Sequence, residues 1–209
     1  VQRLSASSLK RGVLKLSLTM KKLSHLHPAD LAGIIQDLDA NQRIALFQSL
    51  DIETAAKTLS VSDPKIQRSI LDTLGAENAA DIIEKMPPDK AADLLADLPR
   101  EEASELLTKM EQAEAKEVSE LLTYEEDTAG GLMTTEFITS TKDSVVKDIM
   151  EKIRGESPRT ETVYYIFVIE GDNHLIGVVT LRDLLLSRPE QTIGEIMVEN
   201  PVTIHPEEK

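Results

Sequence analysis

Two aspartates, Asp89 and Asp93, form the clearest candidate for binding chemistry in this sequence. They are four residues apart in a segment whose apolar residues have helical spacing, so both side chains are expected on one face of one helix. Left unpaired, two like charges at this spacing cost about a few tenths of a kcal/mol. A cation relieves that repulsion, and Mg²⁺ prefers a few carboxylates while it retains several waters. A cation site and a solvated acidic helix face are therefore both open interpretations of the pair, and acidic helix faces are common.

A glycine pair, Gly130 and Gly131, marks a second place where backbone geometry matters. We interpret Gly130 as a turn residue with positive φ, which glycine adopts without steric cost. For Gly131 two interpretations stay open: the same turn, or a close approach of the backbone to a metal ion. His25 and His27 have no third ligand nearby, so we interpret them as surface polar residues rather than as a metal site.

The aspartate pair lies inside a repeat of twelve residues that begins at Pro28. Eight units follow one another without a gap: PADLAGIIQDLD, ANQRIALFQSLD, IETAAKTLSVSD, PKIQRSILDTLG, AENAADIIEKMP, PDKAADLLADLP, REEASELLTKME and QAEAKEVSELLT. One apolar column contains Ile35, Phe47, Leu59, Leu71, Ile83, Leu95 and Leu107, and a second contains Leu38, Leu50, Leu74, Met86, Leu98, Met110 and Leu122. A third column holds small residues: Ala55, Ala79, Ala91, Ala103 and Ala115.

Each unit predicts one short helix. The apolar residues have helical spacing, and Pro, Asp, Gly and Ser occupy the joins. A helix of about two and a half turns is not stable alone, so each helix must bury its apolar stripe against its neighbours. Residues 28–127 are therefore expected to form an α superhelix, a solenoid of short helices with acidic outward faces, in which the alanine column lets helices approach closely.

After Asp127 the pattern changes to that of a small α+β module. The expected elements are a strand over 135–140, a helix over 145–155 that ends at a glycine, strands over 163–169 and 175–179, and a helix over 181–186. This order is β-α-β-β-α.

The same module begins a second time near residue 194. Gly130-Gly131-Leu132-Met133 recurs 64 residues later as Gly194-Glu195-Ile196-Met197, and Ile138-Thr139 recurs at the same offset as Val202-Thr203. We therefore expect a first copy over 128–192 and the start of a truncated second copy over 193–209.

Several motifs together carry a family resemblance. The run Gly177–Asp183 resembles the last strand and helix of a CBS domain, with its G-x-x-[ST]-x-x-D pattern. The segments His27–Leu31, Tyr124–Met133 and Glu161–Tyr165 resemble the MgtE family of magnesium channels. In that family a helical superhelix precedes two CBS domains and a membrane pore, and the resemblance covers residues 28–209. The pore and most of the second CBS domain are absent from this sequence, and the basic segment 1–27 departs from the usual start.

The resemblance implies ligands for both modules. It places Asp89, Asp93 and Gly131 at a Mg²⁺ site between the helical and CBS domains. It also implies an adenine-nucleotide site, for ATP or a related nucleotide, made by the four residues Tyr165, Thr180, Arg182 and Asp183. Asp183 can accept hydrogen bonds from ribose hydroxyls, Arg182 can pair with phosphate, and Tyr165 can stack on a base. The alternative for Asp183 is that it N-caps the following helix.

Composition limits the remaining function classes. The formal net charge is −14, and residues 1–27 contain six basic and no acidic side chains, so the acidic excess lies entirely in 28–209. Such a chain is expected to repel nucleic acid. There are no cysteines, and no apolar run approaches the roughly 20 residues of a membrane span. No nucleophile–base constellation is recognised, so we expect no enzyme activity.

The leading hypothesis is a cytosolic Mg²⁺-sensing regulatory region of an MgtE-type channel, gated by Mg²⁺-bridged closure of its helical and CBS domains. The resemblance implies a homodimer through the CBS domains, on the cytoplasmic side of a parent chain whose pore lies in the cell inner membrane. The alternative hypothesis is a soluble CBS-type adenine-nucleotide-binding regulatory protein with a helical docking domain and no pore.

Overall fold

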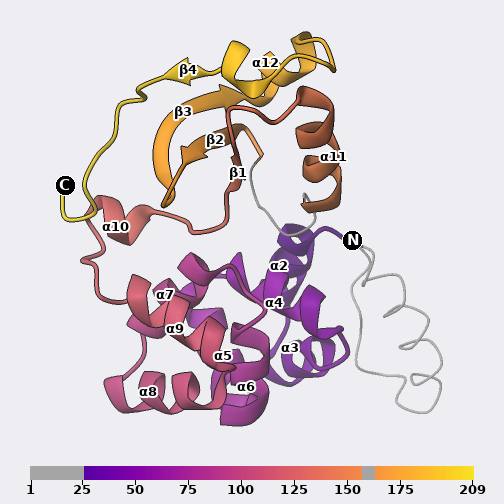
Figure 1. Cartoon of the computed structure of the whole chain (residues 1–209). Coiled ribbons are helices and arrows are strands. Elements are labelled where there is room, and N and C mark those ends of the chain that lie inside the picture. The colour runs from indigo at the N-terminus through magenta and orange to yellow at the C-terminus, as the bar shows by residue number, and fades with distance from the viewer. Residues whose placement is uncertain (1–25, 157–162) are drawn as a thin grey trace. The chain divides into compact units, whose positions relative to one another are not determined.

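The computed structural model describes residues 26–156 and 163–209, and its contacts divide the chain into two compact units, Val1–Thr123 and Tyr124–Lys209 (Figure 1). Each unit is considered by itself below. His25, nearly all of the basic segment 1–27, and Glu161 and Thr162 lie outside the described residues.

The described part of the first unit is entirely helical. Its helices are α2 (Pro28–Asp37), α3 (Ala40–Phe47), α4 (Ile52–Ser60), α5 (Pro64–Leu74), α6 (Ala76–Ile83), α7 (Pro88–Ala96), α8 (Arg100–Lys109) and α9 (Gln112–Leu121). Every one of them begins at the first residue of a twelve-residue unit, so the predicted solenoid of short helices is confirmed.

The residues at the joins explain these starting points. Asp39, Asp51 and Asp63 each N-cap the next helix by accepting a hydrogen bond from a backbone amide of its first turn. The bonds from Thr54 hold the pKa of Asp51 below its ordinary value. His27 caps α2 in the same way, since its Nδ1 accepts from the Ala29 amide at 3.3 Å. A capping role accounts for His27 without a metal.

The first apolar column forms the core of this unit. Ile35, Phe47, Leu59, Leu71, Ile83 and Leu95 are all buried, and Leu107 is half-buried. The helices pack mainly on the helix two further along, as α2 does on α4, α4 on α6, α6 on α8, and α7 on α9. In the alanine column Ala55, Ala79 and Ala91 are buried, while Ala103 and Ala115 are half-buried.

The second unit is a mixed sheet with short helices. Its elements are α10 (Ala129–Leu132), β1 (Ile138–Ser140), α11 (Val146–Glu156), β2 (Tyr165–Glu170), β3 (His174–Thr180), α12 (Leu181–Leu186), the 3₁₀ helix η1 (Ile193–Glu195) and β4 (Val198–Glu199). The strand order is β1-β2-β3-β4, with β1 parallel to β2 and the other pairs antiparallel. The predicted β-α-β-β-α order is confirmed, although β1 is shorter than expected and α11 continues through Gly155 instead of ending there.

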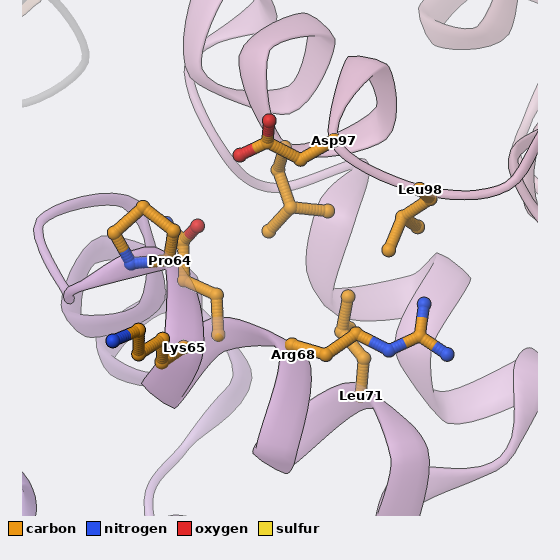
Figure 2. Close-up of a pocket in the computed structure, with 8 residues that line it drawn as sticks. Pro64, Lys65, Arg68, Leu71, Asp97 and Leu98 are labelled. Atoms are coloured by element: carbon orange, nitrogen blue, oxygen red, sulfur yellow. The ribbon is translucent and has the colours of Figure 1, made fainter.

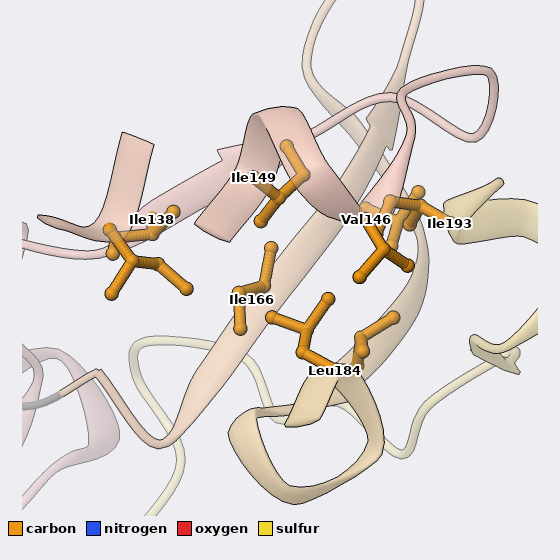
Figure 3. Close-up of a cluster of buried hydrophobic side chains, with 9 residues drawn as sticks. Ile138, Val146, Ile149, Ile166, Leu184 and Ile193 are labelled. Carbon is orange, nitrogen blue, oxygen red and sulfur yellow. The ribbon is translucent and has the colours of Figure 1, made fainter. Parts of the chain in front are cut away.

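An aliphatic cluster fills the space between this sheet and its helices (Figure 3). Ile138 of β1, Ile149 of α11, Ile166 of β2 and Leu184 of α12 meet there, and all are buried. Ile193 of η1 joins them with no exposed surface, and β4 pairs with β3. Residues 193–199 therefore add to the same core and the same sheet as the module before them.

None of the helices in residues 26–156 and 163–209 has the length and apolar composition needed to cross a lipid bilayer.

The buried alanine column predicts that a larger side chain does not fit at its positions. Replacing Ala91, which has no exposed surface, by Leu should lower the free energy of unfolding by about 1–3 kcal/mol, because the extra methyl groups have no space. The same change at the exposed Ala96 of α7 should stay within about 0.5 kcal/mol. Urea unfolding measures both, and equal stabilities for the two variants would show that the alanine is not required for close approach.

Candidate functional site

Helix α7 presents the aspartate pair on its outer face. Pro87 is the N-cap and Pro88 the first helical residue, where a missing N–H has no cost. One face of the helix is buried through Ala91, Ala92, Leu94 and Leu95. Asp89 and Asp93 lie on the other side, with Asp89 in the first turn, where a carboxylate is favoured by the helix dipole.

Lys90 lies between the two carboxylates. Its Nζ is 3.3 Å from Oδ2 of Asp89 and 3.4 Å from Oδ2 of Asp93. Burial lowers the pKa of Lys90, but the two carboxylates outweigh that effect and the pKa is raised above its ordinary value. The repulsion between the two carboxylates is therefore already offset by an ammonium group of the same helix.

The geometry nevertheless shows that the pair can share a cation. Both carboxylates come within 3.4 Å of one positively charged group, and their oxygens are the hard ligands that Mg²⁺ prefers. In the residues that the structure describes, no group of three or more His, Asp or Glu side chains is placed to hold a metal ion. Within its own unit the pair therefore offers two protein ligands.

Neither glycine of the predicted pair needs a positive φ. In the described residues, positive φ values at glycine occur at Gly75 and Gly171, whereas Gly130 and Gly131 lie within α10. The turn interpretation of Gly130 is thus wrong. A Cβ at Gly130 would overlap the ring of Tyr124, and one at Gly131 would overlap the carbonyl of Glu125. Both positions require glycine because other atoms of the same unit come very close.

The amides at the start of α10 are all engaged. The Ala129 and Gly130 amides donate to the carbonyls of Glu208 and Pro206, both at 2.7 Å. The Gly131 amide donates to Thr128 Oγ1 at 3.2 Å. Any metal contact at Gly131 would therefore involve its carbonyl oxygen. Gly131 belongs to the second unit, and the aspartate pair belongs to the first.

The four predicted nucleotide-binding residues gather at one end of the sheet. Tyr165 opens β2 and is the register partner of Thr180, which closes β3. Arg182 and Asp183 follow in the first turn of α12, and Arg182 and Tyr165 are exposed. The N-cap of α12 is Thr180 and not Asp183, whose carboxylate completes a capping box by accepting from the Thr180 hydroxyl and amide. Asp183 thus has a structural role whether or not a nucleotide binds.

A groove on the first unit has no counterpart among the predicted sites (Figure 2). Its volume is about 370 Å³, and it is lined by Pro64, Lys65, Gln67, Arg68 and Leu71 of α5 and by Leu94, Asp97 and Leu98. Arg68 is paired with Asp72 and Glu102, both at 2.8 Å. The charged groups around the groove include both signs, so they do not define one ligand class.

Lys90 is the site residue that sequence analysis missed. It follows Asp89 directly and precedes Asp93 by three residues, a spacing that favours ion pairs on a helix. That spacing could have identified it.

Comparison with known proteins assigns both units. The model of the MgtE intracellular N domain matches residues 26–127, and the model of the CBS domain matches residues 129–190. The chain therefore combines a unit of short stacked helices with a CBS module. The chain belongs to the MgtE family.

Curated relatives carry the name magnesium transporter MgtE. The protein from Enterococcus faecalis is 38% identical over 88 residues, and that from Thermus thermophilus is 40% identical over 88 residues. These alignments cover 42% of this chain and 19% of each relative. The Bacillus subtilis protein is 29% identical over 175 residues, which are 84% of this chain and 39% of that protein. The chain thus matches between about a fifth and two-fifths of the length of these relatives.

Two solved structures are similar over nearly the whole chain. One is the cytosolic domain of the Mg²⁺ channel MgtE in complex with ATP, with a TM-score of 0.80 and 30% identity over 96% of this chain and 83% of that one. The other is the soluble part of a magnesium transporter, with a TM-score of 0.84 and 28% identity over 96% of this chain and 78% of that one.

The close approach at Gly131 can be tested directly. Gly131→Ala should lower the free energy of unfolding of the second unit by about 1–3 kcal/mol, because the new methyl group meets backbone that must shift. Gly155→Ala in α11 is the matched control, since a Cβ there meets nothing within 4 Å and alanine favours a helix by about 0.5–1 kcal/mol. Hydrogen exchange of β2 and β3 amides measures both. Equal protection in the two variants would contradict the steric argument.

Proposed function

We propose that this chain is the Mg²⁺-sensing regulatory region of an MgtE-type magnesium channel. The observation that carries the proposal is the convergence of the Asp89 and Asp93 carboxylates on a single cation, the Lys90 ammonium. The 30% identical neighbour supports it, because that structure is the cytosolic domain of a Mg²⁺ channel.

The carboxylates suit a sensor that must release its ion. Two carboxylates on a partly exposed helix face leave most coordination positions to water, as Mg²⁺ prefers. Few protein ligands favour weak binding, so that occupancy can follow the cellular concentration. When bound, Mg²⁺ would supply two positive charges that neutralise both aspartates.

The gating hypothesis extends this site to both units. In it, Asp89 and Asp93 share Mg²⁺ with the second unit, where the Gly131 backbone is the proposed contact. The linked state keeps the pore of the parent chain shut, on the cytoplasmic side of the cell membrane. When Mg²⁺ falls, the carboxylates lose that link and the closed state loses its stabilisation.

We also propose that residues 193–209 begin a second CBS copy and that the intact protein is a homodimer through its CBS domains. Val202 and Ile204 stand 64 residues after Ile138 and Ser140 of β1. Ile138 is 2% exposed, whereas Val202 is fully exposed. Residues 202–204 form no strand in this structure, and the contrast is expected if they form one only when packed against the remainder of a second module.

The Mg²⁺ site predicts an ion-specific protection. Millimolar Mg²⁺ should slow hydrogen exchange in residues 84–97 and 127–133 more than Na⁺ at the same ionic strength does, because screening depends on ionic strength and not on ion identity. The double variant Asp89→Ala/Asp93→Ala should lose the Mg²⁺-specific part and keep its fold, since Asp93 is exposed and Asp89 only half-buried.

The matched control is Glu101→Ala/Glu105→Ala on α8, which removes two exposed carboxylates at the same i,i+4 spacing. This variant should respond to Mg²⁺ like the parent protein. If Na⁺ reproduces the whole protection, the sensor proposal fails. If the aspartate double variant still responds, the site assignment is wrong.

A second candidate function is adenine-nucleotide binding by the CBS module. The specific observation is that Tyr165, Thr180, Arg182 and Asp183 come together where β3 meets α12. The similar cytosolic domain was solved in complex with ATP, which supports the assignment. Arg182 provides a positive charge for phosphate, and Tyr165 provides an aromatic face for a base.

Arg182 provides the cleaner test, because the Asp183 carboxylate also completes the capping box of α12. Arg182→Ala should weaken ATP binding by about tenfold or more, as expected for a hydrogen bond between charged groups. Arg188→Ala, at another exposed arginine of the same unit, should leave binding unchanged. Calorimetric titration with ATP measures both affinities, and the absence of any heat with the parent protein would remove the nucleotide function.

A further inference from the structure

The contacts of Lys90 differ from those of Lys85, Lys109 and Lys116, whose ion pairs are also described in the first unit. Its ammonium lies within 3.4 Å of two carboxylates one helical turn apart. The described ion pairs of Lys85, Lys109 and Lys116 each join the lysine to one glutamate, which is Glu84, Glu77 and Glu120 respectively. Lys90 is also half-buried, whereas Lys116 is exposed. The aspartate pair therefore has a cation of its own that is covalently attached to the same helix.

A tethered cation changes the electrostatics of ion binding at this pair. An incoming ion must displace the ammonium before both carboxylates can turn to it. A monovalent ion replaces the single positive charge of the ammonium with another single charge. The replacement therefore brings no net gain in Coulomb attraction to the two aspartates. A divalent ion replaces that one positive charge with two, so the replacement still brings a net gain in Coulomb attraction. This gain is smaller than the gain at an aspartate pair with no lysine beside it.

We propose that Lys90 is an affinity-setting residue, which competes as an internal cation for Asp89 and Asp93 and so raises the Mg²⁺ concentration at which the pair is occupied. This inference rests on the proposed Mg²⁺ site. Lys90 has two states: in one it bridges the aspartates, and in the other its ammonium turns to solvent while Mg²⁺ holds them. Because the ammonium belongs to the same helix, its effective concentration at the aspartates is constant. The Mg²⁺ concentration at which the pair becomes occupied is therefore fixed by α7 itself.

Removal of the competing charge tests the proposal. Lys90→Gln keeps a polar side chain of similar length and should lower the Mg²⁺ midpoint by about threefold to tenfold, the range expected for loss of one or two partly exposed ion pairs. Lys90→Arg retains the charge and should stay within about twofold of the parent protein. Lys116→Gln on α9 removes the same charge from a pair with one carboxylate and should also stay within about twofold, since its effect is only that of net charge. The measurement is a Mg²⁺ titration at constant ionic strength, followed by the amide NMR shifts of residues 89–97.

The outcomes separate this inference from the function on which it rests. A parent protein that binds Mg²⁺ at α7 with the same midpoint as Lys90→Gln would overturn the role of Lys90 and leave the sensor proposal intact. Equal tightening in Lys116→Gln would also overturn it, because net charge would then explain the change. If neither the parent protein nor Lys90→Gln shows a Mg²⁺-specific shift at α7, both the sensor site and the role of Lys90 are wrong.

Discussion

Helices of eight to eleven residues such as α2–α9 do not persist in water by themselves, because the cost of nucleation is not repaid over so few turns. Their stability comes from the apolar column that each buries against the helix two positions along. Ile35, Leu59 and Ile83 are buried in successive even-numbered helices for this reason. The outward residues can then carry charge without loss of this stability. The positions of the two aspartates on α7 therefore depend on the burial of the apolar face of that helix.

This arrangement explains how a dense acidic surface is tolerated. The buried face sets the position of each helix, and the outward side chains contribute little to the fold. A net negative surface charge is therefore compatible with the fold and favours solubility. Lys90 shows that such a surface is not simply negative. An internal ammonium can hold two carboxylates in place while it remains displaceable, because a partly exposed pair gains little stability from it.

The second unit uses close backbone contact instead of a repeated stripe. Gly131 lies against the Glu125 carbonyl, and the Gly130 amide bonds the Pro206 carbonyl. Residues separated by more than seventy positions therefore meet at α10. Both units are similar to parts of a solved cytosolic domain of a Mg²⁺ channel, and each has a core of its own.

The sequence by itself determined the helical architecture, because the twelve-residue period gives every short helix an apolar stripe that it must bury against its neighbours. Helix starts followed from Asp39, Asp51 and Asp63, whose side chains cap locally. It also located the second module, because alternation and turn residues act over short distances. Only the tertiary structure decided what non-local contacts control: that Gly130 lies under Tyr124 and not in a turn, and that Ile193 enters the core of the preceding module. The Lys90 bridge was also beyond the interpretation made from the sequence. Its spacing was visible, but whether a flexible ammonium turns to one carboxylate, to two or to solvent depends on the burial and packing around it.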